Sequence, residues 1–144
     1  MSLKRLDIYN VRNIREQSIL PATTFNFIYG KNGSGKSALI EAIFLLGRAK
    51  SFRSSSIKSV IAFNQPDLIV SADILKDKQR TIHMGIRMDG NETEIRINHL
   101  QNQKRISLAY GLPLQIIHPK SFELLYASSK IRQIGRRGGR ERCY

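Results

Sequence analysis

The sequence predicts an α/β fold in which a strand, a glycine-rich loop and a helix pack with a mixed, partly antiparallel sheet. Residues 23–30 alternate in the manner of a strand, with Phe25 and Tyr29 on one side, and we expect this strand to be buried on both faces. Residues 36–47 carry apolar side chains at helical spacing and predict a mostly buried helix. With 144 residues, the chain has room for one domain with a core of its own.

The other elements follow from the same patterns. Leu6 and Ile8 alternate in an opening strand that breaks into a turn at "NVRN". Three alternating segments, separated by the turn sequences "KDKQ" and "DGNE", predict an antiparallel meander. These segments are 67–75, 80–88 and 93–98. Further along, the pattern predicts a short helix at 102–111, a buried strand at 112–119 and another helix at 120–129.

The net charge of +13 favours a nucleic-acid partner, because clustered Lys and Arg release counterions from phosphates. Residues 130–144 contribute +5 of this charge and have no apolar period. We therefore expect a lobe at 1–129 and a basic, disordered tail at 130–144. The change in composition suggests a reading-frame shift or a fused vector end, and a genuine DNA-binding tail is the alternative.

Cysteine content and hydropathy indicate the cellular setting. The single cysteine, Cys143, excludes an internal disulfide and has no base nearby to make it a nucleophile. There is no run of about eighteen apolar residues, so no membrane partner is expected. A cytoplasmic location fits both observations.

The glycine-rich loop matches the pattern G-x-x-x-x-G-K-[ST] between a predicted strand and a predicted helix. Its residues are Gly30, Lys31, Asn32, Gly33, Ser34, Gly35, Lys36 and Ser37. Glycines let backbone N–H groups approach phosphates closely, and the helix start adds its positive dipole end. Lys36 is expected to reach the β- and γ-phosphates of a nucleotide, and the Ser37 hydroxyl to bind Mg²⁺.

Three stretches extend the match beyond the loop: "YNVRNI", "FNFIYGKNGSGKSALIEAIFLLGRAKSFRS" and "LPLQIIHPKSFELL". Together, over roughly Met1 to Tyr126, they resemble the start of the RecF family of bacterial DNA replication and repair proteins. The resemblance implies the first lobe of an ABC/SMC/RecF-type P-loop ATPase head, with ATP and Mg²⁺ as cofactors. It also implies a role at gapped DNA and in the SOS response to DNA damage. The expected partners are double-stranded/single-stranded DNA junctions, a second copy in an ATP-dependent homodimer, and recombination mediator proteins.

The resemblance assigns roles to residues outside the loop. Arg12 and Asn13 match an "RN" pair that lies beside the nucleotide in this superfamily; a polar turn is the alternative. Gln115 matches a glutamine that touches Mg²⁺ or the attacking water; the alternative is a strand glutamine facing an interface between lobes. Lys50 and Arg53 match a basic turn expected to contact DNA phosphates, and a solvated surface turn is the alternative.

The resemblance implies that hydrolysis requires a further apolar strand ending in acidic residues, and this feature is missing from the sequence. The nearest match, "LIVSAD", ends at Asp73 but is followed by Ile74. A Ser-Gly signature that would meet the γ-phosphate of a second subunit is also absent. We therefore expect a truncated chain of marginal stability, with an open sheet edge and uncertain turnover.

Two other functions stay open: a basic nucleic-acid binder with no productive nucleotide cycle, and a small P-loop kinase. The kinase lacks a convincing lid arginine pair and an acidic residue for the acceptor. We expect no metal site of another kind, because His83, His99 and His118 are widely separated and have no Cys or paired acid at ligand spacing.

Overall fold

The structure, a computed structural model, describes residues 1–117. The chain divides into two units, Met1–Leu114 and Gln115–Tyr144, and the account below concerns the first. The predicted helix at 120–129 and the basic tail at 130–144 lie outside the described residues.

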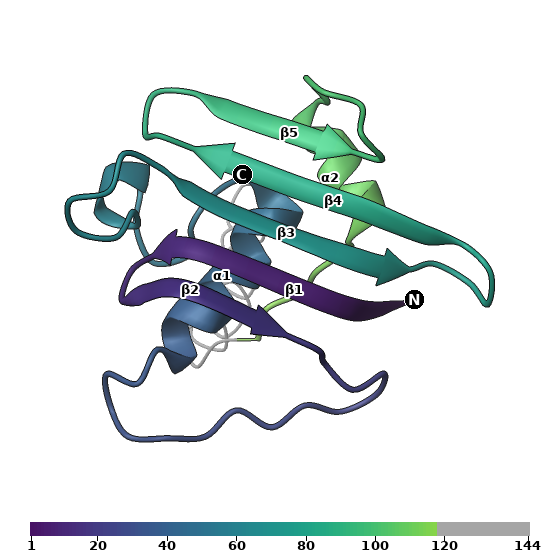
Figure 1. The fold of residues 1–144 in the computed structure, drawn as a ribbon, viewed down its shortest axis with the longest axis horizontal. Helices are drawn as coiled ribbons and strands as arrows, with labels where there is room; N and C mark the ends of the chain where they lie inside the picture. The colour runs from purple at the N-terminus through teal and green to yellow at the C-terminus, as the bar shows by residue number, and fades with distance from the viewer. Residues whose placement is uncertain (118–144) are drawn as a thin grey trace, which may run out of the picture. The chain divides into compact units, whose positions relative to one another are not determined.

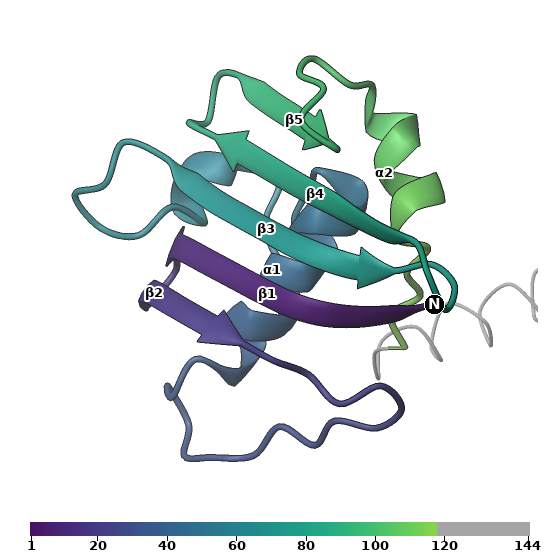
Figure 2. The same ribbon diagram turned by 45° about the vertical axis from the view of Figure 1, so that its right-hand side comes forward.

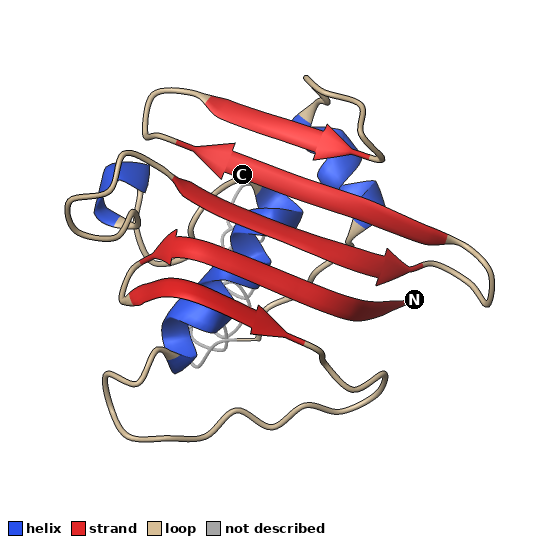
Figure 3. Ribbon diagram, in the orientation of Figure 1, coloured by secondary structure: helices blue, strands red, loops and turns tan. Residues whose placement is uncertain are grey.

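A five-stranded sheet forms the frame of the first unit, in the order β2-β1-β3-β4-β5. Every neighbouring pair is antiparallel. The strands are β1 (Ser2–Val11), β2 (Ile14–Ile19), β3 (Leu68–Leu75), β4 (Thr81–Met88) and β5 (Thr93–Ile97). The predicted meander is confirmed as β3, β4 and β5, and Figures 1 and 3 show β1 placed between it and β2.

Strand β2 was not predicted because its sequence, "IREQSI", is mostly polar and shows no apolar alternation. It forms because the turn at Arg12 and Asn13 returns the chain along β1, with Val11 opposite Ile14. The turn also lies against the segment that precedes β3, since the backbone N–H of Arg12 donates to Val60 O at 2.7 Å. A tight hairpin with β1 and the contact of Arg12 with Val60, rather than an apolar pattern in β2, therefore fix this end of the sheet.

Two helices, α1 (Lys36–Arg48) and α2 (Arg105–Gly111), lie on one side of the sheet. Figures 1 and 2 show α1 crossing behind the strands, where it packs against β1, β3 and β4. A short 3₁₀ turn, η1 (Ile57–Ser59), connects α1 to β3. The core lies between α1 and the sheet, and its largest fully buried side chains include Leu6, Ile8, Leu45, Leu46 and Leu68. The α/β class predicted from the sequence is confirmed, and the sheet of residues 1–117 is antiparallel throughout.

The prediction of a buried strand at 23–30 is wrong. These residues have no regular secondary structure, and their aromatic side chains point into solvent. Phe25, Phe27 and Tyr29 are 81%, 88% and 92% exposed. Within residues 1–117 no strand pairs with this segment, and a strand requires a partner to satisfy its backbone groups. The apolar residues do alternate along this segment, but no other element among residues 1–117 packs over their side chains.

The predicted strand at 112–119 is also absent over its described residues, 112–117. Instead, Leu112 and Leu114 pack against α1, which approaches them closely at Gly47. A Cβ atom at Gly47 would lie only 2.3 Å from Leu114 Cδ1. Gly47 therefore permits this crossing, while the helix itself continues to Arg48.

No helix among the described residues is long and apolar enough to cross a membrane.

Candidate functional site

The glycine-rich loop leads directly into α1, as the motif predicts. Gly33 and Gly35 have φ values of 80° and 93°, in the left-handed region that favours glycine. The carbonyl of Gly35 accepts the first bond of the helix, from Leu39 N at 2.9 Å. At Gly30 an added Cβ would lie 2.8 Å from Ser34 Oγ, so a side chain at this position would require Ser34 to move.

Lys36 folds back over the loop from the first position of α1. Its Nζ donates to the carbonyls of Gly30 at 2.5 Å and Lys31 at 2.6 Å, and lies 3.4 Å from Ser34 Oγ. The ammonium charge is therefore held within the loop by backbone oxygens. A phosphate at this position would meet a cation that is already in place.

The turn between β1 and β2 lies beside the loop, because Asn13 Nδ2 donates to Gly33 O at 2.8 Å. Together the turn and the loop enclose a hollow of about 330 Å³. Its lining is Arg12, Asn13, Asn32, Gly33, Gly35, Lys36, Ser37, Ala38 and Arg53. The structure thus brings together Arg12, Asn13, Lys36 and Ser37, four residues that the sequence assigned to one site.

A larger hollow of about 860 Å³ shares Arg12 and Asn13 with the first. Arg15 and Lys58 give it positive charge, and Phe63, an aromatic side chain that is 81% exposed, also lines it. The two hollows therefore share the β1–β2 turn as part of their walls.

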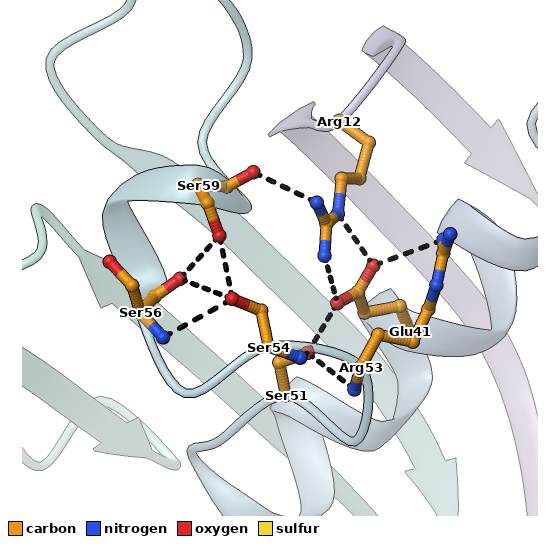
Figure 4. A network of polar contacts seen from close by, with 7 residues as sticks. All are labelled: Arg12, Glu41, Ser51, Arg53, Ser54, Ser56 and Ser59. Carbon is orange, nitrogen blue, oxygen red and sulfur yellow. Dashed lines mark hydrogen bonds and ion pairs between the residues drawn. The ribbon is translucent and has the colours of Figure 1, made fainter.

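A buried carboxylate, Glu41, joins the elements around the loop (Figure 4). It lies on α1 and accepts two hydrogen bonds from Arg12, with Nε–Oε2 at 2.9 Å and Nη2–Oε1 at 3.0 Å. Ser51 Oγ also donates to Oε1. The guanidinium of Arg53 lies farther away, with Nη1 at 3.7 Å from Oε2. One carboxylate thus connects α1, the β1–β2 turn and the segment after α1.

The ionisation of Glu41 reflects two opposed effects. Burial disfavours the charged form, but the hydrogen bonds from Arg12 and Ser51 and the charges of Arg12 and Arg53 outweigh it. The net result is a pKa of Glu41 below its usual value. The same hydrogen bond raises the pKa of Arg12. Both groups are therefore charged at neutral pH.

The remaining predicted residues are placed differently. Arg53 lines the hollow above the loop, whereas Lys50 is exposed and lines a separate hollow of about 210 Å³ together with Arg105. The two basic residues, predicted as one DNA contact, thus belong to two hollows. Gln115 is exposed and belongs to the second unit, so its proposed contact with Mg²⁺ or water stays a prediction.

Asp73, the nearest sequence match to a hydrolytic acid, lies on the face of the sheet opposite α1. There its Oδ1 is 2.7 Å from His83 Nδ1, and His83 stacks on His99 with ring centroids 6.3 Å apart. Among residues 1–117, no cluster of three His, Cys, Asp or Glu side chains is arranged to hold a metal ion.

Sequence reasoning missed Glu41 and Ser51. A signal existed for Glu41, since it is the single charged residue between Ser37 and Arg48 in an otherwise apolar helix. A charge within a buried helical stretch requires a partner, and the partner, Arg12, is 29 positions away. The identity of that partner could not be deduced from local sequence.

Comparison with known proteins identifies related chains. The family model described as the RecF/RecN/SMC N terminal domain matches residues 2–130. A protein named DNA replication and repair protein RecF, from Pseudomonas putida (strain GB-1), is 41% identical over 134 residues. Its namesake from Azotobacter vinelandii is 40% identical. These alignments cover 92% of this chain but only 36% and 37% of the relatives.

The fold is likewise similar to that of a solved protein. The structure of the recombination mediator protein RecF–ATP in the RecFOR pathway superposes with a TM-score of 0.78 and 26% sequence identity. The match covers 85% of this chain and 33% of the solved one. The chain therefore spans about a third of the length of the proteins that it matches.

Proposed function

The chain belongs to the RecF/RecN/SMC N-terminal domain family, and from this premise we propose that it is an ATP-binding lobe of a DNA replication and repair protein. The lobe comprises residues 1–129, and residues 130–144 form a basic extension. Support comes from the names of the relatives and from the similarity to an ATP-bound RecF. The observation that carries the proposal is the hollow above the loop, which gathers Lys36, Ser37, Arg12 and Asn13.

The loop is suited to the phosphates of a nucleoside triphosphate. Lys36 holds its ammonium at the carbonyls of Gly30 and Lys31, where the phosphate oxygens would lie. On binding, Lys36 exchanges two backbone carbonyls for phosphate oxygens, and Arg53 adds a second cation from the side of the hollow. The hydroxyl of Ser37 is exposed to the same hollow and would hold Mg²⁺.

In this proposal the base and ribose of ATP would occupy the larger hollow, which shares Arg12 and Asn13 with the first. Phe63 offers an exposed aromatic face there, and Arg15 and Lys58 offer cations. A ligand with phosphates at one end and an aromatic ring at the other matches the two adjoining spaces.

DNA is the second proposed ligand. Lys50 and Arg105 line one hollow on the surface, and exposed basic residues bind phosphates independently of sequence. A junction between double-stranded and single-stranded DNA, an ATP-dependent homodimer and recombination mediator proteins belong to the same proposal, as does a cytoplasmic location. A nucleic-acid binder without a nucleotide cycle is the second candidate, favoured by the net charge of +13.

The test is ATP binding by the full chain and by Lys36→Ala, measured by isothermal titration calorimetry with Mg²⁺. A charge-assisted phosphate contact contributes roughly 1.5–3 kcal/mol, so we expect the variant to bind about ten-fold or more weakly. Lys78→Ala, an exposed lysine in the β3–β4 turn, is the control and should bind as the unmodified chain does. Equal ATP affinity in Lys36→Ala would refute nucleotide binding at the loop. DNA binding that persists with no response to ATP would favour the second candidate.

A further inference from the structure

Glu41 is the one fully buried carboxylate among the described residues, with 0% of its surface exposed. Although it lies next to the hollow above the loop, it is not part of the lining. No buried side-chain nitrogen or oxygen in the described region lacks a hydrogen-bond partner, so its oxygens are satisfied within the protein. Glu41 therefore acts on its neighbours and not on a ligand.

The first neighbour is Arg12, whose guanidinium is fixed on two sides. Nε and Nη2 donate to the two oxygens of Glu41, and Nη1 donates to Ser59 O at 3.0 Å. Its backbone has a φ of 54°, which places the residue in the left-handed region. Both ends of the side chain are thus held where it lines the two hollows.

The second neighbour is Arg53, which Glu41 reaches through Ser51. Ser51 Oγ donates to Glu41 and accepts from the backbone N–H groups of Arg53 at 2.9 Å and Ser54 at 3.0 Å. The guanidinium itself lies 3.7 Å from Glu41 Oε2, which is beyond hydrogen-bonding distance. The backbone of Arg53 is fixed, while its side-chain N–H groups stay available to the hollow that it lines.

We propose that Glu41 is a positioning residue, which holds the guanidinium of Arg12 and the backbone of Arg53 at the rim of the phosphate hollow. The inference rests on the proposed function, since it assumes that the hollow takes the phosphates of ATP. It extends that function, because it assigns the geometry of two arginines to one carboxylate that never contacts the ligand. Figure 4 shows both arginines directed toward the carboxylate of Glu41, Arg12 from the β1–β2 turn and Arg53 from the segment after α1.

A purely structural ion pair would give a different result. Such a pair would change the free energy of unfolding on mutation but would leave the contribution of Arg53 to ATP binding unchanged. A positioning role instead couples the two residues, so their effects on ATP affinity are not additive. A double-mutant cycle separates the two cases.

The cycle uses the full chain, Arg53→Ala, Glu41→Gln and the double variant, with ATP–Mg²⁺ as the ligand in calorimetry. Glu41→Gln keeps the size of the side chain and removes its charge. We expect Arg53→Ala to weaken ATP binding about ten-fold in the original chain and less than about two-fold in the Glu41→Gln background. Glu94→Gln, the same change at a partly exposed carboxylate on the opposite face of the sheet, is the matched control and should leave the affinity unchanged.

Two results would overturn the proposal: an equal loss from Arg53→Ala in both backgrounds, or ATP binding by Glu41→Gln that matches or exceeds that of the original chain. If Glu41→Gln does not fold, Ser51→Ala takes its place, because it removes the link to the Arg53 backbone and leaves the Arg12 pair intact. This variant should also bind ATP several-fold more weakly and reduce the effect of Arg53→Ala. Additive effects in that cycle would overturn the proposal equally.

A ligand-free measurement separates this inference from the proposed function. In two-dimensional ¹H–¹⁵N NMR spectra, the Nε–H of Arg12 should exchange slowly with water in the original chain and rapidly in Glu41→Gln. Failure of the original chain to bind ATP would refute the proposed function, whereas this NMR difference would still support the positioning of Arg12. Rapid exchange in both chains would overturn the inference whatever the result with ATP.

Discussion

Arg12 Nε lies 2.9 Å from Glu41 Oε2, and this hydrogen bond joins the turn after β1 to the helix that follows the glycine-rich loop. The Glu41 side chain is fully buried, whereas that of Arg12 is 26% exposed. The contact therefore holds Arg12, which lines the hollow above the loop, against a carboxylate that does not line it.

Because the pKa of Glu41 is held below its usual value, its contribution to stability depends on pH. The stabilisation is fully present above the unfolded-state pKa, about 4.3, and is lost as the pH falls through the lower folded-state pKa. At neutral pH we expect Glu41→Gln to lower the free energy of unfolding by roughly 3 kcal/mol, the low end for a broken buried pair, because water reaches part of Arg12. Urea unfolding at several pH values, from about 7 to about 3, should show this difference shrinking in acid. A constant difference across that range would contradict the prediction.

Ser37→Ala should separate Mg²⁺ binding from phosphate binding. The hydroxyl of Ser37 lines the hollow, and its loss removes a ligand for the cation but no contact made by Lys36. ATP affinity should fall several-fold when Mg²⁺ is present and should change little in EDTA, as measured by calorimetry. Ser37→Thr keeps the hydroxyl and should restore the Mg²⁺ effect. An equal loss of ATP affinity with Mg²⁺ and in EDTA would show that Ser37 does not act through the cation.

Lys50→Ala should reduce the dependence of DNA binding on salt. Each phosphate contact contributes about 0.9 to the slope of the logarithm of affinity against the logarithm of salt concentration, so one lost contact should flatten the slope by about one unit. Fluorescence anisotropy with a labelled duplex carrying a single-stranded end would measure it. Lys78→Ala is the control for a lost surface charge. An unchanged slope in Lys50→Ala would show that this lysine does not touch DNA.

The exposed aromatic residues before the loop should bind an apolar dye. Phe25, Phe27 and Tyr29 are each more than 80% exposed, and together they form an apolar stretch of the kind that dyes and other chains recognise. The folded chain should enhance the fluorescence of 8-anilinonaphthalene-1-sulfonate, and Phe25→Ser with Phe27→Ser should remove most of that signal. Leu100→Ser, at an isolated leucine that is 65% exposed, is the control. Equal fluorescence in all three chains would show that the dye binds elsewhere.

Local sequence predicted the parts of the molecule that depend on near neighbours. The loop motif, the helix α1 and the meander of β3, β4 and β5 all follow from spacing within about ten residues. The strand expected at 23–30 failed because a strand depends on a partner, and its own apolar alternation does not supply one. Strand β2 forms for the converse reason: its sequence is polar, but β1 lies beside it as a partner.

The candidate site shows the same division. Lys36 and Ser37 were predicted from the motif, whereas the buried pair of Glu41 with Arg12 joins residues 29 positions apart. Arg53 was predicted as a basic residue for DNA, and only the fold shows that the segment after α1 turns back to the loop. Charge and residue type were visible in the sequence, but their distribution between two hollows was not.

Helix α1 also has a mechanical consequence. Its 13 residues run from the loop to Arg48, whose Nη2 donates to Leu114 O at 3.0 Å. A helix of this length is a stiff rod of about 20 Å, so a tilt of about three degrees at one end displaces the other by about 1 Å. Because Gly47 packs against Leu114 and Arg48 holds the carbonyl of Leu114, such a tilt would shift Leu114, the last residue of the first unit.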